Sequence, residues 1–141
     1  MSIIKISVIT ITYNAENVIM RTLDSVLKQT FSNIEHIIID GASKDSTLLA
    51  EREYESRSCS TNNGHEIKII SEPDKGLYDA MNKGIGKATG NYLVFLNAGD
   101  VFPSSSTLET VADMIGDGEE LPGVLFGDTN IVDDNGNFLR H

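Results

Sequence analysis

The feature that most constrains this chain is a regular alternation between short apolar runs rich in β-branched residues and longer stretches of helical periodicity. The apolar runs have the length of buried strands, and they fall at 3–12, 34–40, 66–71, 91–96 and 123–132. The stretches between them predict helices over 15–29, from residues 43–46 to about 54, 77–88 and 106–115. Strands that alternate with helices are typical of a mostly parallel sheet with helices on both faces. The sequence therefore predicts an α/β fold.

Three local signals set the expected ends of these elements. Asn14 is a good N-cap residue for the helix over 15–29. The polar residues 56–65 are expected to form a loop of roughly ten residues, which is longer than the usual connection. The segment "DDNGN" at 133–137 carries the Asn-Gly pair of a β-hairpin turn. Because this hairpin comes so close to residue 141, we expect the chain to be truncated at its C-terminus.

Length and charge narrow the class of protein. A chain of 141 residues is most economically one domain, 1–141, that buries a core without disulfides. The net charge of −10 argues against a partner such as nucleic acid or an anionic membrane surface, because both need basic patches. No apolar run approaches the ~20 residues of a membrane span, and no signal peptide is evident. With a single cysteine, Cys59, the chain fits a reducing compartment, and we expect a cytoplasmic protein.

Small and polar residues follow each of the first four expected strands. These segments are "TYN", "DGAS", "EPDKG" and "NAGD", and three of the four carry a carboxylate. In a doubly wound sheet ligands bind beyond the carboxyl ends of the strands, so Asp40, Asp74 and Asp100 are expected to border one pocket. Each also has a plainer interpretation: Asp40 as a helix cap, Asp74 as a turn residue after Pro73, and Asp100 as a cap for the last helix.

Two long blocks of the sequence resemble a known family. The first is "SVITITYNAENVIMRTLDSVLKQTFSNIEHIIIDGASKDST" and the second is "SEPDKGLYDAMNKGIGKATGNYLVFLNAGDVF". Both are similar to family 2 glycosyltransferases, and the second is closer to bacterial members that build surface polysaccharides, including the colanic-acid type. The resemblance covers about residues 5–103 and continues weakly beyond them. It implies the GT-A fold, a Rossmann-like sheet, and the transfer of a sugar from a nucleotide-diphosphate donor to an acceptor hydroxyl.

The resemblance also implies roles for particular residues. Thr12 and Tyr13 should line the nucleoside pocket, and Asp40 should hydrogen-bond the base or the ribose. The residues that should flank the nucleotide or its sugar are Asp74, Lys75, Gly76 and Asp79.

The family usually requires Mn²⁺ or Mg²⁺, held by a D-x-D motif. Asp100 falls where that motif ends, and Asn97 and Gly99 stand where many members carry aspartates. Asp100 is therefore expected to be the metal ligand of this chain. A cation bridging two phosphates and bound to a hard oxygen ligand would explain how an acidic protein binds a dianionic donor.

No catalytic residue is expected within 1–141. Inverting members use a carboxylate base that lies well downstream of the D-x-D motif, in the half that forms the acceptor site. The resemblance thus implies the donor-binding part of an inverting glycosyltransferase, with little or no transfer by this chain alone. One alternative is a non-catalytic nucleotide-sugar-binding module. A nucleotidyltransferase is disfavoured, because 13–21 offers a single basic residue and no glycine-rich phosphate loop.

The expected partners follow from the same resemblance. They are a nucleotide-diphosphate sugar, with a UDP-sugar favoured, and a saccharide or lipid-linked acceptor, which would place the full-length protein at the periphery of the inner membrane. A homodimer is also expected if apolar residues meant for the missing half are exposed, including Phe126, Ile131 and Phe138.

Overall fold

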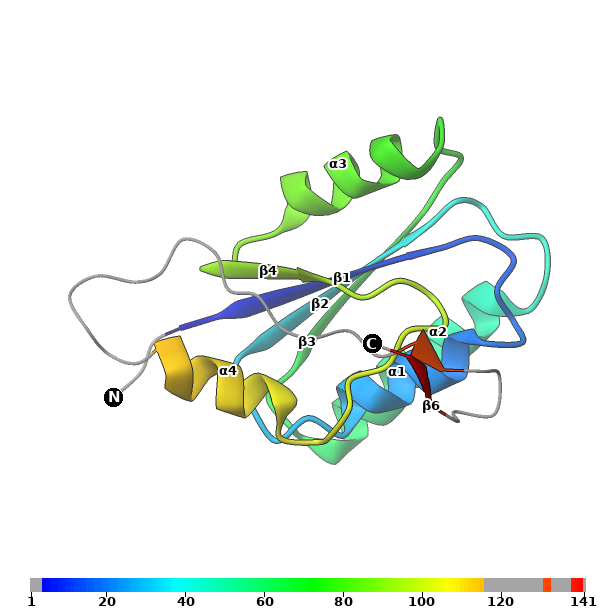
Figure 1. Cartoon of the computed structure of the whole chain (residues 1–141). Coiled ribbons are helices and arrows are strands. Elements are labelled where there is room, and N and C mark those ends of the chain that lie inside the picture. Colours follow the sequence, from blue (N-terminus) through cyan, green and yellow to red (C-terminus); the bar gives the residue numbers. More distant parts are fainter. Residues whose placement is uncertain (1–3, 116–130, 133–137, 141) are drawn as a thin grey trace.

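The computed structural model describes residues 4–115, 131–132 and 138–140 of the chain. Its strands are β1 (Ile6–Thr12), β2 (Ile34–Asp40), β3 (Glu66–Ser71), β4 (Tyr92–Phe95), β5 (Ile131–Val132) and β6 (Phe138–Arg140). Its helices are α1 (Ile19–Leu27), α2 (Thr47–Thr61), α3 (Leu77–Lys87) and α4 (Thr107–Ile115). The first four strands form a parallel sheet in the order β3-β2-β1-β4 (Figure 1).

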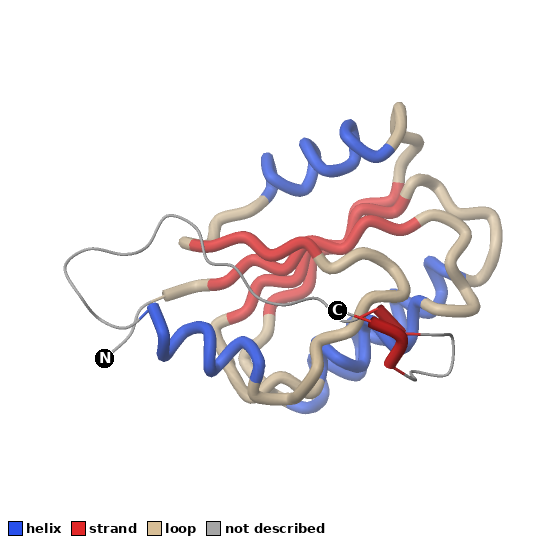
Figure 2. The backbone as a smooth tube through the Cα atoms, viewed as in Figure 1, coloured by secondary structure: helices blue, strands red, loops and turns tan. Residues whose placement is uncertain are grey.

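Helices cover both faces of this sheet, as the sequence predicts. Helix α3 lies on one face, and α1, α2 and α4 lie on the other (Figure 2). On the α3 face, Ile9, Ile37 and Ile39 of the two central strands pack against Ala80. Larger clusters fill the opposite face, where α1, α2 and α4 supply side chains such as Leu23, Tyr54 and Leu108. The α/β prediction is confirmed.

Helix α1 begins later than expected, and Asn14 is not its N-cap. The helix begins at Ile19 after a turn in which the Val18 and Ile19 N–H groups donate to the Ala15 carbonyl. Asn14 has a left-handed φ of 47° instead, and its side-chain oxygen accepts from the Lys44 N–H at 2.8 Å. The cap prediction failed because this polar side chain bonds to the neighbouring loop.

Helix α2 is longer than expected, and most of the predicted loop 56–65 belongs to it. Four buried residues, Thr47, Glu51, Tyr54 and Ser58, recur at helical spacing along one side of α2. Tyr54 anchors this side, because its hydroxyl lies 2.7 Å from Nδ1 of the buried His36. The helix ends at Thr61 and is followed by Asn62, which has a left-handed φ of 55°. The polar composition of 56–65 gave the wrong prediction, because this helix is stabilised by contacts with the rest of the fold more than by an apolar periodicity.

The C-terminal expectations are tested only in part. Strands β5 and β6 pair antiparallel on either side of the expected hairpin turn, in a sheet of their own. Residues 123–130 of the fifth expected strand, the turn 133–137 and Phe126 lie outside the described residues. None of the helices in the described part of the chain has the length and apolar character that a membrane span needs.

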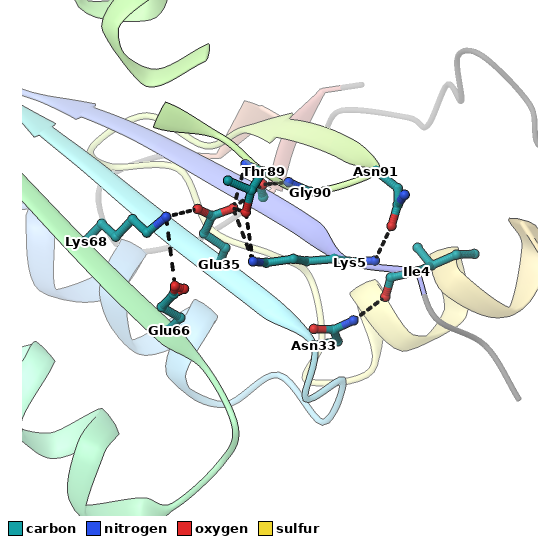
Figure 3. Close-up of polar contacts among 10 residues, drawn as sticks. Ile4, Lys5, Asn33, Glu35, Glu66, Lys68, Thr89, Gly90 and Asn91 are labelled. Carbon is teal, nitrogen blue, oxygen red and sulfur yellow. Dashed lines mark hydrogen bonds and ion pairs between the residues drawn. The ribbon is translucent and has the colours of Figure 1, made fainter. Parts of the chain in front are cut away.

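A buried carboxylate ties the amino ends of the strands together. Glu35 of β2 is fully buried and accepts hydrogen bonds from Ser7 of β1, Lys68 of β3, and both the N–H and the hydroxyl of Thr89, before β4 (Figure 3). Burial by itself raises the pKa of Glu35, but the bonds from Lys68, Thr89 and Ser7 outweigh it and lower this pKa to about 2. The ionised carboxylate therefore stabilises the fold.

We predict that Glu35→Gln lowers the free energy of unfolding by on the order of 2–3 kcal/mol at pH 7. Because the folded pKa lies below that of a free carboxyl, the wild type should lose this advantage as the pH falls from about 4.5 toward 2. Urea denaturation at pH 7 and pH 3 measures both effects. The exposed Glu53→Gln serves as the control, and equal stability of Glu35→Gln and wild type at pH 7 would contradict the prediction.

Candidate functional site

The loops after the four parallel strands are joined to one another at the carboxyl edge of the sheet. The Gly41 N–H donates to the Thr12 carbonyl at 3.0 Å, and the Glu72 N–H donates to the Asp40 carbonyl at 3.0 Å. On the other side of β1, the Ala98 N–H donates to the Ile11 carbonyl at 3.3 Å. Strand β1 lies where the strand order reverses, with β2 on one side and β4 on the other. This is the place at which open α/β sheets bind ligands.

A pocket of about 300 Å³ opens beside the end of β1. Its lining comes from β1, from the β3–α3 loop and from the first turns of α3, and consists of Ile11, Thr12, Tyr13, Asp74, Gly76, Leu77 and Ala80. Tyr13 is 57% exposed, so its ring is free to stack on a flat ligand. Four expected nucleotide-binding residues, Thr12, Tyr13, Asp74 and Gly76, are therefore brought together here.

Asp40 lies behind the pocket and is not part of its lining. Its carboxylate is fully buried: Oδ1 accepts from the Ser43 hydroxyl at 2.6 Å, while Oδ2 accepts from the Ser43 N–H at 2.9 Å and the Ser71 hydroxyl at 2.8 Å. In this arrangement Asp40 holds the β2–α2 loop against the end of β3. It does not cap α2, where the Asp45 carboxylate accepts from the Thr47 N–H. Its contact with a base or ribose stays a prediction.

Gly41 leaves room for two side chains of the pocket wall, those of Asp74 and Tyr13. A Cβ at this position would lie 2.9 Å from Oδ2 of Asp74 and 3.4 Å from the Tyr13 ring. Any side chain at position 41 would therefore require the Asp74 carboxylate to move. Glycine at this position thus lets the Asp74 carboxylate and the Tyr13 ring lie close to the loop after β2.

The β3–α3 loop is shaped by its own carboxylates and by Lys83. Asp74 accepts from the Gly76 N–H at 3.1 Å, and Asp79 in the first turn of α3 accepts from the Lys75 N–H at 2.9 Å. Lys83 donates to the Pro73 carbonyl at 3.0 Å and pairs with Asp79 at 3.6 Å. Asp79 thus fixes the loop conformation, whereas Asp74 is both a turn residue and part of the pocket wall.

The segment "NAGD" forms a tight turn directly after β4. The Asp100 N–H closes the turn by donating to the Asn97 carbonyl at 2.9 Å. Gly99 occupies the third position with a φ of 99°, which a type II turn requires and which glycine adopts without strain. The turn is bonded to the strand that borders the pocket, because the Ala98 N–H donates to the Ile11 carbonyl, while Ala98 itself packs with the cluster on the α1 and α2 face.

Asp100 presents its carboxylate on the surface of this turn. The side chain is exposed, and no hydrogen bond or ion pair to its carboxylate occurs among the described residues. Helix α4 is capped by other residues, since the Leu108 N–H donates to Oε1 of Gln29. The plainer interpretation of Asp100, as a cap for the last helix, therefore finds no support.

The donor set suits a divalent cation that is bound together with a ligand. Asp100 offers one hard oxygen donor, and the described residues contain no cluster of three or more His, Cys, Asp or Glu side chains that could hold a metal. A single carboxylate fits a cation whose remaining positions are filled by phosphate oxygens and water, as is usual for Mg²⁺. A metal held in this way would neutralise a diphosphate leaving group.

Comparison with known proteins identifies the family. The model for Glycosyl transferase family 2 matches residues 7–136. The chain belongs to glycosyltransferase family 2. The family 2 chain is 37% identical over 122 residues to a "PGL/p-HBAD biosynthesis glycosyltransferase" of Mycobacterium tuberculosis, covering 86% of this chain and 45% of that protein. It is 33% identical over 96 residues to glycosyltransferase GlyA of Streptococcus pneumoniae, covering 68% of this chain and 13% of that protein.

Solved structures of glycosyltransferases share the fold of the family 2 chain. One is the mannosyltransferase PcManGT from Pyrobaculum calidifontis in complex with GDP-Man and Mn²⁺, with a TM-score of 0.67, 28% identity, and coverage of 81% of this chain and 33% of that one. Another is S. aureus TarS in complex with UDP-GlcNAc, with a TM-score of 0.66, 25% identity, and coverage of 89% and 39%. The GT-A fold is confirmed, and the chain spans less than half the length of these relatives.

Sequence reasoning missed several polar residues that build the site. Ser43 and Ser71 hold Asp40, Asn14 joins the first two loops, and Lys83 organises the third. Glu51 of α2 was missed as well: it is fully buried, and neither carboxyl oxygen has a partner in the described residues. The sequence gives only a weak signal that Glu51 is buried. Glu51 lies three positions before the core-facing Tyr54, but most glutamates on helices are exposed.

Glu51 carries a proton at neutral pH. Burial raises its pKa to about 8, and the charges of Asp40 and Asp45 add to this effect against the opposing charge of Arg52. The folded chain therefore keeps a proton that the unfolded chain releases above about pH 4.5. It follows that Glu51 makes the fold less stable as the pH rises from 4.5 to 8.

We predict that Glu51→Gln removes this pH dependence. Glutamine has the same shape and no proton to lose, so the variant should match the wild type near pH 4.5 and exceed it by roughly 2 kcal/mol or more at pH 8. Urea denaturation of both proteins at the two pH values measures the difference, with the exposed Glu53→Gln on the same helix as control. A constant difference between wild type and Glu51→Gln across this range would contradict an uncharged Glu51.

Proposed function

We propose that this chain binds the nucleotide-diphosphate sugar of a family 2 glycosyltransferase, and that the enzyme passes the sugar to an acceptor hydroxyl. The observation that carries the proposal is the position of the exposed Asp100 carboxylate. It lies on the turn that is bonded through Ala98 to Ile11 of β1, a strand that borders the pocket. A pocket for a nucleoside and a carboxylate for a metal-bound diphosphate thus both lie at the carboxyl edge of one sheet.

The nucleoside is proposed to occupy the pocket beside β1. Tyr13 offers an exposed ring for stacking, and the Asp74 carboxylate offers an acceptor at the opposite wall. The neighbours support a nucleotide sugar without fixing its base, since PcManGT was solved with GDP-Man and TarS with UDP-GlcNAc. A UDP-sugar remains our favoured donor.

The diphosphate is proposed to lie over the turn at Asn97–Asp100, with Mn²⁺ or Mg²⁺ held by Asp100. When bound, the cation would offset the negative charge that develops on the departing nucleotide diphosphate. The residues of this chain would orient the donor: Asp100 through the metal, and the Asp74–Gly76 segment at the nucleoside end. Single displacement with inversion is the proposed mechanism, with the general base outside the described residues.

The acceptor is proposed to be a saccharide or a lipid-linked glycan, and the reaction a step in building a surface polysaccharide or glycolipid. The mycobacterial relatives named for PGL/p-HBAD biosynthesis support this class of product. We further propose that the protein acts in the cytoplasm.

We predict metal-dependent binding of a nucleotide diphosphate that requires Asp100. Calorimetric titration of UDP, with GDP as comparison, should give measurable affinity with Mn²⁺ and much weaker affinity without it. Asp100→Ala should reduce the metal-dependent affinity by about tenfold or more, because it removes the only proposed protein ligand of the cation.

The matched control is Asp113→Ala, which removes an exposed aspartate from α4. It should bind UDP as the wild type does. Failure of the folded wild type to bind either nucleotide in the presence of Mn²⁺ would contradict the proposed donor site, and equal binding by Asp100→Ala would remove Asp100 from it.

A further inference from the structure

Helix α1 holds both backbone groups of the glycine that precedes Asp100. The Gly99 N–H donates to the Thr22 hydroxyl at 2.7 Å, and the Gly99 carbonyl accepts from Nε of Arg21 at 2.9 Å. These two side chains are neighbours in the sequence and come from an element 77 and 78 residues away. Thr22 is fully buried, so its bond to Gly99 is shielded from competing water.

A third bond fixes the chain on the far side of Asp100. The Phe102 N–H donates to the Ser25 hydroxyl at 3.2 Å, and the Ser25 hydroxyl donates to the Thr22 carbonyl at 2.8 Å. The turn is therefore bonded to α1 one residue before Asp100 and again two residues after it. We call Arg21, Thr22 and Ser25 the α1 clamp.

The position of the Asp100 carboxylate depends on this backbone attachment. The side chain has no hydrogen bond in the described part of the chain that could orient it directly. The helix that carries the clamp also follows the loop that contributes Tyr13 to the pocket. The clamp thus fixes the backbone on both sides of the one carboxylate proposed to meet the diphosphate.

We propose that Arg21 and Thr22 are positioning residues for the metal, acting through Gly99 on the placement of Asp100. This inference rests on the proposed function, because it needs a divalent cation bound at Asp100. In a site with a single protein ligand, no second carboxylate can maintain metal binding if Asp100 is displaced. A shift of the turn therefore weakens metal binding directly. Arg21 and Thr22 themselves are not proposed to touch the metal.

The first test measures the clamp without metal or nucleotide. Thr22→Val keeps the shape of the side chain and removes the hydroxyl that accepts from the Gly99 N–H. Amide hydrogen exchange of the segment 97–102 should be faster in Thr22→Val than in wild type, and Thr22→Ser, which keeps the hydroxyl, should restore slow exchange. Unchanged exchange in Thr22→Val would contradict the clamp.

The second test measures metal binding by the chain with UDP, using Mn²⁺ titration followed by electron paramagnetic resonance. Arg21→Gln and Thr22→Val should each weaken Mn²⁺ binding by about tenfold, as loss of a residue supporting a metal ligand typically does. Affinity for UDP without metal should not change, which separates positioning from a general loss of structure. Thr22→Ser and the control Arg57→Gln, which breaks the surface pair with Asp24, should resemble the wild type.

The outcomes separate this inference from the proposed function. If Asp100→Ala abolishes Mn²⁺ binding while Arg21→Gln and Thr22→Val bind it as tightly as wild type, the donor site stands and the positioning role is wrong. If the wild type shows no metal-dependent binding, the proposed function fails and this inference fails with it. Should Thr22→Val not fold, Arg21→Gln at a half-buried position carries the test.

Discussion

The buried Glu35 carboxylate is the interaction on which the arrangement of the sheet depends. It receives bonds from β1, from β3 and from the segment before β4, so one charged group aligns all four parallel strands at their amino ends. An ionised carboxylate in such a place is costly unless every acceptor position is used, and here Ser7, Lys68 and Thr89 use them. With the amino ends fixed, the parallel register of the strands places their following loops at a common edge.

The opposite edge uses carboxylates in two different ways. Asp40 has the same character as Glu35, because it is buried and serves to hold loops together through Ser43 and Ser71. Asp100 is exposed, and within 4–115 the chain holds only its backbone in place. Rigid support from Asp40 and an exposed carboxylate on the turn after β4 suit the site that we propose for a metal and a diphosphate.

The order of strands and helices could be predicted from the sequence, because the burial of a whole segment is visible in its apolar residues, as in 34–40. The turn at "NAGD" could also be placed, since glycine and aspartate after a strand mark a loop. What could not be predicted are contacts between residues far apart in the chain. Asn14 bonds to the second loop instead of capping α1, and the polar end of α2 is helical because Tyr54 and Ser58 face the interior. Nothing local reveals these pairings.

The central claim is that a nucleotide diphosphate binds across the loops after β1, β3 and β4. Amide hydrogen exchange of the chain, with and without UDP and Mn²⁺, tests it most directly, because the exchange rate is measured for each loop separately. The account predicts slower exchange on binding in 12–15, 72–79 and 97–102, with little change at the amino ends of the strands. Protection confined to the amino ends around Glu35 and Thr89, or protection that spares 97–102, would contradict it.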